Sequence, residues 1–135
     1  MSLITDLLEK PTNLSTASKY TVMNGVLYIG TGVLIIAWPG VVQTLFRDAP
    51  FVGHEGGLFR IVGLLLVVVG WFYFFGGRSG ARQAVAASVV DRLVFVPLIF
   101  FPLAFAGVDP HLLVAFAIID LLLGIGAWIL LRRKA

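Results

Sequence analysis

Apolar residues run along most of this chain in four stretches, which short polar or glycine-rich breaks separate. The stretches cover residues 20–38, 58–76, 83–106 and 111–131. Each is long enough to cross the hydrocarbon core of a bilayer, which takes about 20 helical residues. A shorter amphipathic pattern precedes them, with Leu3, Ile4, Leu7 and Leu8 on one side of a helix and Asp6 and Glu9 opposite. The pattern predicts an all-α polytopic membrane protein with an interfacial segment over residues 1–19 and a four-helix transmembrane bundle over residues 20–135.

Small and polar residues recur at helical spacing within each stretch and predict which face packs inward. Small side chains let membrane helices approach one another closely, so these faces are expected to form the interior. They are Asn24, Tyr28, Thr31 and Ile35 in the first helix, Gly56, Arg60, Gly63, Gly70 and Gly77 in the second, Ala84, Ala87, Ser88 and Asp91 in the third, and Ala117, Asp120, Gly124 and Ala127 in the fourth.

Composition strengthens the membrane interpretation and excludes several other classes of protein. Hydrophobic residues make up 59% of the 135 residues and charged residues 13%, and the mean hydropathy is +1.01. A soluble domain of this size would need far more polar surface. The sequence has no cysteine, which excludes disulfides, thiol catalysis and cysteine-ligated metals. It has no basic stripe with interleaved aromatics, so we expect no nucleic-acid partner.

The distribution of basic residues predicts the orientation of the helices. Seven flank the N-terminus, the connection between the second and third helices, and the C-terminus: Lys10, Lys19, Arg78, Arg82, Arg132, Arg133 and Lys134. The opposite side has only Arg47 in its connections. Because basic residues accumulate on the cytoplasmic side, both termini are expected there. On the outer side, Asp109 directly precedes Pro110 and is expected to cap the fourth helix.

The adjacent pair Asp91 and Arg92 interrupts an otherwise apolar stretch. Counting about 1.5 Å per residue from the cytoplasmic ends places both residues in one layer with Tyr28 and Asp120. The side chains of adjacent residues on a helix point about 100° apart, so Asp91 and Arg92 are expected to contact two different neighbouring helices. We expect Arg92 to reach Asp120, and Asp91 to meet Tyr28 or Asn24.

Two acids and one base leave one negative charge in this layer. Either Arg60 reaches down to balance it, or one aspartate holds a proton. Such a layer could be a static network that fixes helix register, or a functional site, since ionisable residues inside a membrane are costly. The two histidines, His54 and His111, lack metal-ligand spacing, so we expect no metal and no cofactor.

Three segments resemble small bacterial four-helix membrane proteins of the DoxX-like and BphX-like type: "LFRIVGLLLVVVGWFYFFGGRSG", "DRLVFVPLIF" and "LLVAFAIIDLLLGIGAWILLRR". The resemblance spans roughly residues 57–133 and is carried by Phe59-Arg60, Gly63, Gly70, Arg92 and Asp120. Asp91 departs from the usual pattern. The resemblance implies a four-helix bundle in the bacterial inner membrane, sometimes encoded with catabolic or redox enzymes.

Three functions follow from these residues. The first is a non-enzymatic membrane protein that binds an apolar small molecule, a partner subunit or a second copy of itself, with Asn24, Arg60 and Arg92 in the binding network. The second is an intramembrane isomerase or cyclase in which Asp91 and Asp120 act as acid and base and Tyr28 assists. The third is a small proton-coupled carrier.

Overall fold

The computed structural model describes residues 2–9 and 13–133, so the basic residues Lys10 and Lys134 lie outside the described part. Helices account for most of it: α1 Leu3–Leu7, α2 Thr16–Ala37, α3 Pro39–Leu45, α4 Glu55–Arg78, α5 Arg82–Val90, the π-helical η1 Asp91–Phe95, α6 Val96–Phe105 and α7 Pro110–Arg132. Four spans in the described residues are long and apolar enough to cross a membrane: α2, α4, the continuous α5–η1–α6 helix, and α7. The predicted all-α architecture of four long apolar helices is confirmed.

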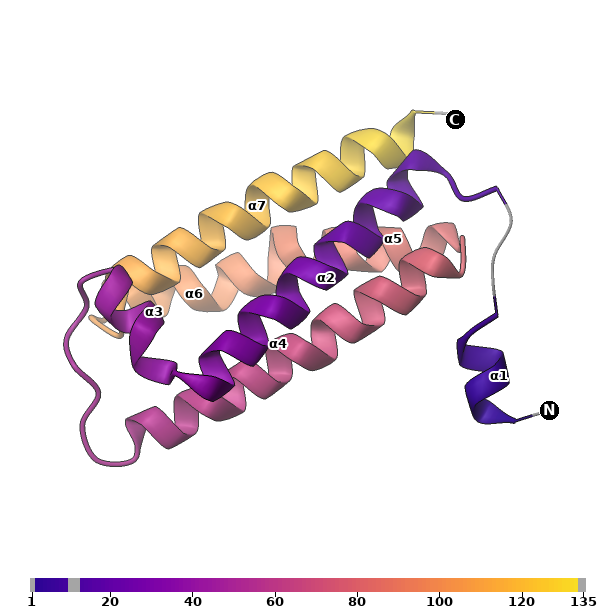
Figure 1. Ribbon diagram of the computed structural model, residues 1–135. Coiled ribbons are helices and arrows are strands. Elements are labelled where there is room, and N and C mark those ends of the chain that lie inside the picture. Colours follow the sequence, from indigo (N-terminus) through magenta and orange to yellow (C-terminus); the bar gives the residue numbers. More distant parts are fainter. Residues whose placement is uncertain (1, 10–12, 134–135) are drawn as a thin grey trace.

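The four long helices run alongside one another as a bundle (Figure 1). α2 packs along α4, whereas α6 packs on α7. Both ends of the described chain and the connection between α4 and α5 lie at one end of the bundle, and α3 and the α6–α7 turn lie at the other. α2 begins at Thr16, four residues before the predicted start, because the Ser15 hydroxyl caps it by accepting a hydrogen bond from the Ser18 amide.

Glycines form the contact between α2 and α4. Gly63 and Gly70 of α4 face Gly32 and Gly25 of α2 so closely that a Cβ on any of them would come within 3 Å of backbone atoms of the other helix. Gly77 makes the same approach beside Ser18, whereas a Cβ on Gly56 would meet nothing within 4 Å. The predicted glycine face is therefore confirmed at Gly63, Gly70 and Gly77, but it does not include Gly56.

The third span presents a different face from the predicted one. Val85, Ser88, Val89 and Arg92 are buried, whereas Ala87 is exposed. Val85 and Val89 fill a core cluster with Ala17 and Ala127, because branched side chains occupy space that the alanines would leave empty. The helix is consequently turned by about one residue, or about 100°, from the prediction.

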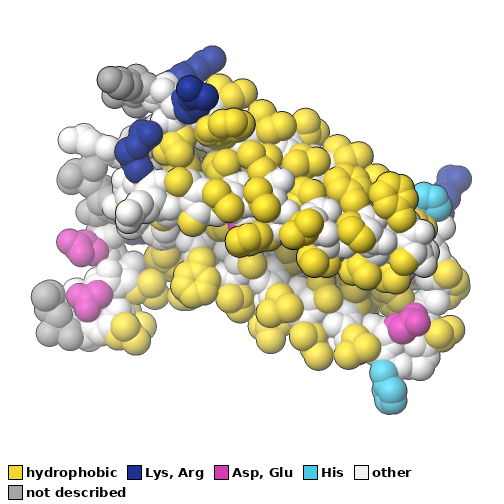
Figure 2. All heavy atoms as spheres, turned by 180° about the vertical axis from the view of Figure 1, so that it is seen from behind, with side chains coloured by type: hydrophobic (Ala, Val, Ile, Leu, Met, Phe, Trp, Pro, Cys, Tyr) yellow, Lys and Arg dark blue, Asp and Glu magenta, His cyan; other side chains and the backbone are white. Residues whose placement is uncertain are grey.

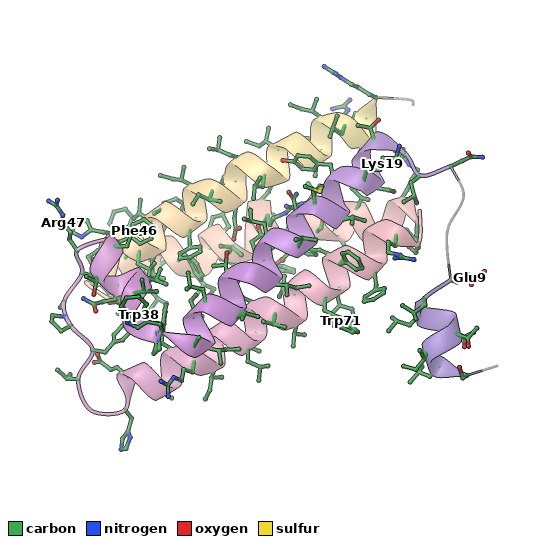
Figure 3. All side chains as sticks on the ribbon, in the orientation of Figure 1. Glu9, Lys19, Trp38, Phe46, Arg47 and Trp71 are labelled. Carbon is green, nitrogen blue, oxygen red and sulfur yellow. The ribbon has the colours of Figure 1, made fainter. Side chains whose placement is uncertain are left out.

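Hydrophobic side chains cover the middle of the molecule and charged ones gather at its two ends (Figure 2). Lys19 lies at the end that holds both termini, and Arg47 lies at the opposite end (Figure 3). Trp71 points away from the bundle, as a lipid-facing side chain would. The short α1 lies apart from the bundle, and its Leu3 is 81% exposed.

Candidate binding site

The structure brings most of the predicted polar layer together inside the bundle. Asn24 and Tyr28 on α2, Arg92 on η1 and Asp120 on α7 are all buried. Asp91 on η1 is half-buried and reaches the same layer from the side of α4. The exterior of the bundle at this depth is apolar, so these side chains are the chemically distinctive feature of its interior.

Two aspartate–tyrosine hydrogen bonds organise this layer. The Tyr28 hydroxyl donates to Asp120 Oδ1, and the Tyr73 hydroxyl donates to Asp91 Oδ2. The two tyrosine rings meet edge to face, with centroids 5.3 Å apart and planes at 67°, a favourable aromatic geometry. The prediction that Asp91 meets Tyr28 or Asn24 is wrong, because Tyr73 of α4 reaches it instead.

The hydrogen bonds of the Arg92 side chain go to Ser88 on its own helix and not to Asp120. The side chain is 1% exposed, and it folds back along the helix so that Nε donates to the Ser88 carbonyl at 3.1 Å and Nη2 to the Ser88 hydroxyl at 3.0 Å. Its guanidinium carbon lies 5.0 Å from the centre of the Tyr73 ring, within range of a cation–π interaction. In the described residues the only contact within 4.0 Å between a basic and an acidic side chain is between His111 and Asp48. The predicted Arg92–Asp120 pair is therefore wrong.

Arg60 does not belong to this layer. Its side chain is exposed on α4, and no hydrogen bond or ion pair reaches it within the described part of the chain. The expectation that it balances the layer is wrong, because α4 turns this position outward where the glycine contact with α2 has already ended.

A widened helical turn places Asp91 and Arg92. The Val96 amide donates to the carbonyl of Asp91, five residues back, instead of to the residue four back. Pro97 follows directly, and proline in an α-helix has no N–H to donate and presses on the carbonyl four residues earlier. The π-helical turn relieves this conflict, and such turns are frequent at functional sites.

An apolar cavity of about 130 Å³ opens next to the layer. Tyr28, Tyr73, Asp91 and Asp120 form its polar wall. The remaining wall is apolar and comes from α2, α4, α6 and α7: Ile35, Phe59, Val62, Leu66, Val69, Val96, Phe100, Leu112, Leu113 and Phe116. The cavity thus lies between two closely packed pairs of helices, α2 with α4 and α6 with α7.

Each carboxylate has one oxygen free to meet a bound molecule. Tyr28 occupies Oδ1 of Asp120 and Tyr73 occupies Oδ2 of Asp91. No hydrogen bond from a described residue reaches Asp120 Oδ2 or Asp91 Oδ1, and both side chains line the cavity. Asp120 as a whole is only 8% exposed, so its free oxygen meets the cavity rather than the outside of the bundle. The buried atoms of the layer that lack a partner among the described residues are the donors Asn24 Nδ2 and Arg92 Nη1.

A second, wider hollow of about 630 Å³ lies between the connection that precedes α4, the first turns of α4 and the α6–α7 turn. Phe59 and Val62 line both this outer hollow and the inner cavity, so the two spaces adjoin at these side chains. Glu55 and Asp109 are the charged residues of its lining. Burial raises the pKa of Asp109, and the neighbouring Asp48 and Glu55 carboxylates raise it further.

Asp48 anchors this end of the molecule. Its carboxylate accepts hydrogen bonds from the His111 amide at 3.1 Å and the Leu112 amide at 2.8 Å, and it lies 2.9 Å from Nδ1 of His111. Asp48 thus caps α7, the role predicted for Asp109. Asp109 does precede α7, but it adopts left-handed backbone angles and its side chain makes no capping bond.

Sequence reasoning missed Tyr73 and Asp48. Tyr73 is three residues after Gly70 and four before Gly77, so the spacing of the inner glycines would have identified it. Asp48 carries no local signal, because its partners lie more than sixty residues away in the chain.

Comparison of the chain with protein families, curated proteins and solved structures finds no match. The resemblance to DoxX-like and BphX-like proteins therefore stays a prediction.

Proposed function

We propose that this is an integral protein of the bacterial cytoplasmic membrane that binds a small lipophilic molecule between its helices, with both termini in the cytoplasm. The inner cavity carries the proposal, because an apolar space ends on two carboxylates that each keep an unused acceptor oxygen. Binding sites for small molecules are concave and mostly apolar, with a few converging polar groups that fix orientation. This space has that composition.

Burial of charge also favours a binding role. A charged side chain at the centre of a bilayer costs at least about 2.5–3.5 kcal/mol. Asp120 is buried without an ion-pair partner within 4.0 Å among the described residues. A layer that served only helix register would gain from pairing its charges directly. The glycine contact between α2 and α4 supplies close packing without the layer.

Native mass spectrometry of the gently solubilised protein tests the proposal. The wild type should retain a small molecule, Asp120→Asn should lose it, and Asp6→Asn should keep it, because Asp6 lies on the exposed α1. Equal adducts on all three proteins would contradict a site at Asp120.

Fusion of reporter domains to either terminus tests the orientation. A fluorescent reporter that folds only in the cytoplasm should be bright at both ends. A reporter that is active only on the outer, non-cytoplasmic side of the membrane should show no activity at either terminus. Acid–base catalysis by Asp91 and Asp120 on the bound molecule, proton-coupled transport and assembly with a partner subunit or a second copy stay predictions from the sequence.

A further inference from the structure

We propose that the ligand of the inner cavity is a small organic cation, an amine whose ammonium group lies between Asp91 and Asp120. This inference rests on the proposed function and adds the chemical class of the molecule. It follows from the charge, the hydrogen-bonding character, the size and the approach of the cavity.

Charge is the first argument. The layer contains the carboxylates of Asp91 and Asp120 and one guanidinium, that of Arg92. Arg60 of α4 is exposed, and no hydrogen bond or ion pair joins it to a described residue of the layer. With both carboxylates ionised, one negative charge remains without a counterpart among the described side chains of the layer, and a monovalent cation would neutralise it. An anionic ligand would add to it.

Hydrogen-bonding character is the second argument. The tyrosine hydroxyls already donate their protons to the carboxylates. Asn24 Nδ2 and Arg92 Nη1 are donors without a partner among the described residues, but neither side chain lines the cavity. The cavity therefore offers the acceptor oxygens Asp91 Oδ1 and Asp120 Oδ2 and no uncommitted donor from the described residues. An ammonium group is the complement of such a wall, because it has three donors and no acceptor. The faces of Tyr28 and Tyr73 add aromatic surface of the kind that attracts organic cations.

Size is the third argument. The cavity measures about 130 Å³, and an engineered apolar cavity of about 150 Å³ holds one benzene molecule. By this comparison the inner space fits no more than about one small ring or an equivalent branched chain, and any further part of a ligand would extend towards the adjoining outer hollow.

The approach from outside is the fourth argument. The outer hollow adjoins the inner cavity at Phe59 and Val62, and its charged lining residues, Glu55 and Asp109, are both acidic. Clefts lined by one sign of charge concentrate ligands of the opposite sign. A cation would thus be attracted to the outer hollow, which adjoins the inner cavity at Phe59 and Val62.

Binding of three matched probes to the purified protein in a zwitterionic detergent tests the inference. The probes are para-fluorobenzylamine, para-fluorobenzyl alcohol and para-fluorobenzoate, which share one ring and differ in the charge of the head. Fluorine NMR line broadening near neutral pH reports the affinity of each. The amine should bind wild-type protein at least about tenfold more tightly than the alcohol, as for hydrogen bonds to charged rather than neutral groups, and the benzoate should not bind.

Variants locate the effect. In Asp91→Asn and Asp120→Asn the advantage of the amine over the alcohol should shrink several-fold, whereas Asp6→Asn should keep it. Equal binding of amine and alcohol to the wild type, or tighter binding of benzoate, overturns the cation inference and leaves the cavity as a lipophilic site. Absence of binding by all three probes overturns the proposed function as well. The wild-type comparison needs no variant, so it remains decisive if an asparagine variant fails to fold.

Discussion

Replacing Gly25 by alanine should separate α2 from α4 and destabilise the bundle. The added Cβ would lie 2.5 Å from the Phe74 backbone nitrogen and 2.6 Å from the Gly70 carbonyl oxygen. Moving from 2.5 Å to the 3.4 Å at which ordinary contact begins requires a shift of about 0.9 Å. Both obstacles are backbone atoms, so no side-chain rotation can provide that space.

The loss of stability caused by Gly25→Ala can be measured against a control substitution on the same helix, Gly30→Ala. Overpacking costs about 1–3 kcal/mol, and rigid backbone obstacles place Gly25→Ala at the upper end. A Cβ on Gly30 would meet nothing within 4 Å, so Gly30→Ala should be neutral or stabilising by up to about 1 kcal/mol, the usual advantage of alanine over glycine in a helix. Both variants share this gain in helix propensity. The difference between them therefore isolates the contact between α2 and α4.

Unfolding in mixed micelles with increasing dodecyl sulfate, followed by tryptophan fluorescence, measures both variants against wild type. Gly25→Ala should unfold at clearly lower detergent fraction than Gly30→Ala. If the two variants unfold together, the close approach of α2 and α4 is not a feature of the folded protein.

Three further changes test other contacts. Tyr73→Phe removes the hydroxyl that donates a hydrogen bond to the half-buried Asp91 and should lower the free energy of unfolding by about 1–2 kcal/mol, within the range for hydrogen bonds in proteins; an unchanged unfolding curve would contradict this hydrogen bond. Asp48→Ala uncaps α7 and should cost about 1–2 kcal/mol, which Asp48→Asn should partly restore in the same assay. The raised pKa of Asp109 means that its charged form is less favourable in the folded state. Asp109→Asn should therefore gain thermal stability over wild type as pH rises above about 4, the ordinary range of the group, and lose that advantage in more acidic buffer; an advantage independent of pH would refute the raised pKa of Asp109 that burial and the neighbouring carboxylates cause.

The buried face of a helix could be predicted from the sequence most accurately where small residues recur along one face only. Ala117, Asp120, Gly124 and Ala127 were expected on the inner face of α7 and all four are buried, because small residues at this spacing leave only one face able to pack closely. The third span was harder to predict. Small residues there lie on more than one face, and the volume of Val85 and Val89 decides which face is inside.

The polar layer shows where prediction from one chain ends. Depth along each helix placed Tyr28, Asp91, Arg92 and Asp120 in one layer, and the structure agrees. Depth says nothing about rotation, however, and rotation selects the partners. Arg92 has acceptors within its own preceding turn at Ser88, and a long flexible side chain satisfies these before it reaches another helix. Tyr73 then takes the place beside Asp91 that the sequence assigned to α2.

The π-helical turn at Asp91–Phe95 also bears on how such a site could arise. A turn of this kind holds one residue more than an α-helical turn while the helix on either side keeps its direction. Insertion of a single codon into an α-helical turn produces a turn of this kind and adds one side chain at the polar layer. The faces that α5 and α6 present to their neighbours would stay as they are. The chemistry of the cavity can therefore change in one mutational step without redesign of the surrounding bundle, so sequences related to this one could share its scaffold and differ in what they bind.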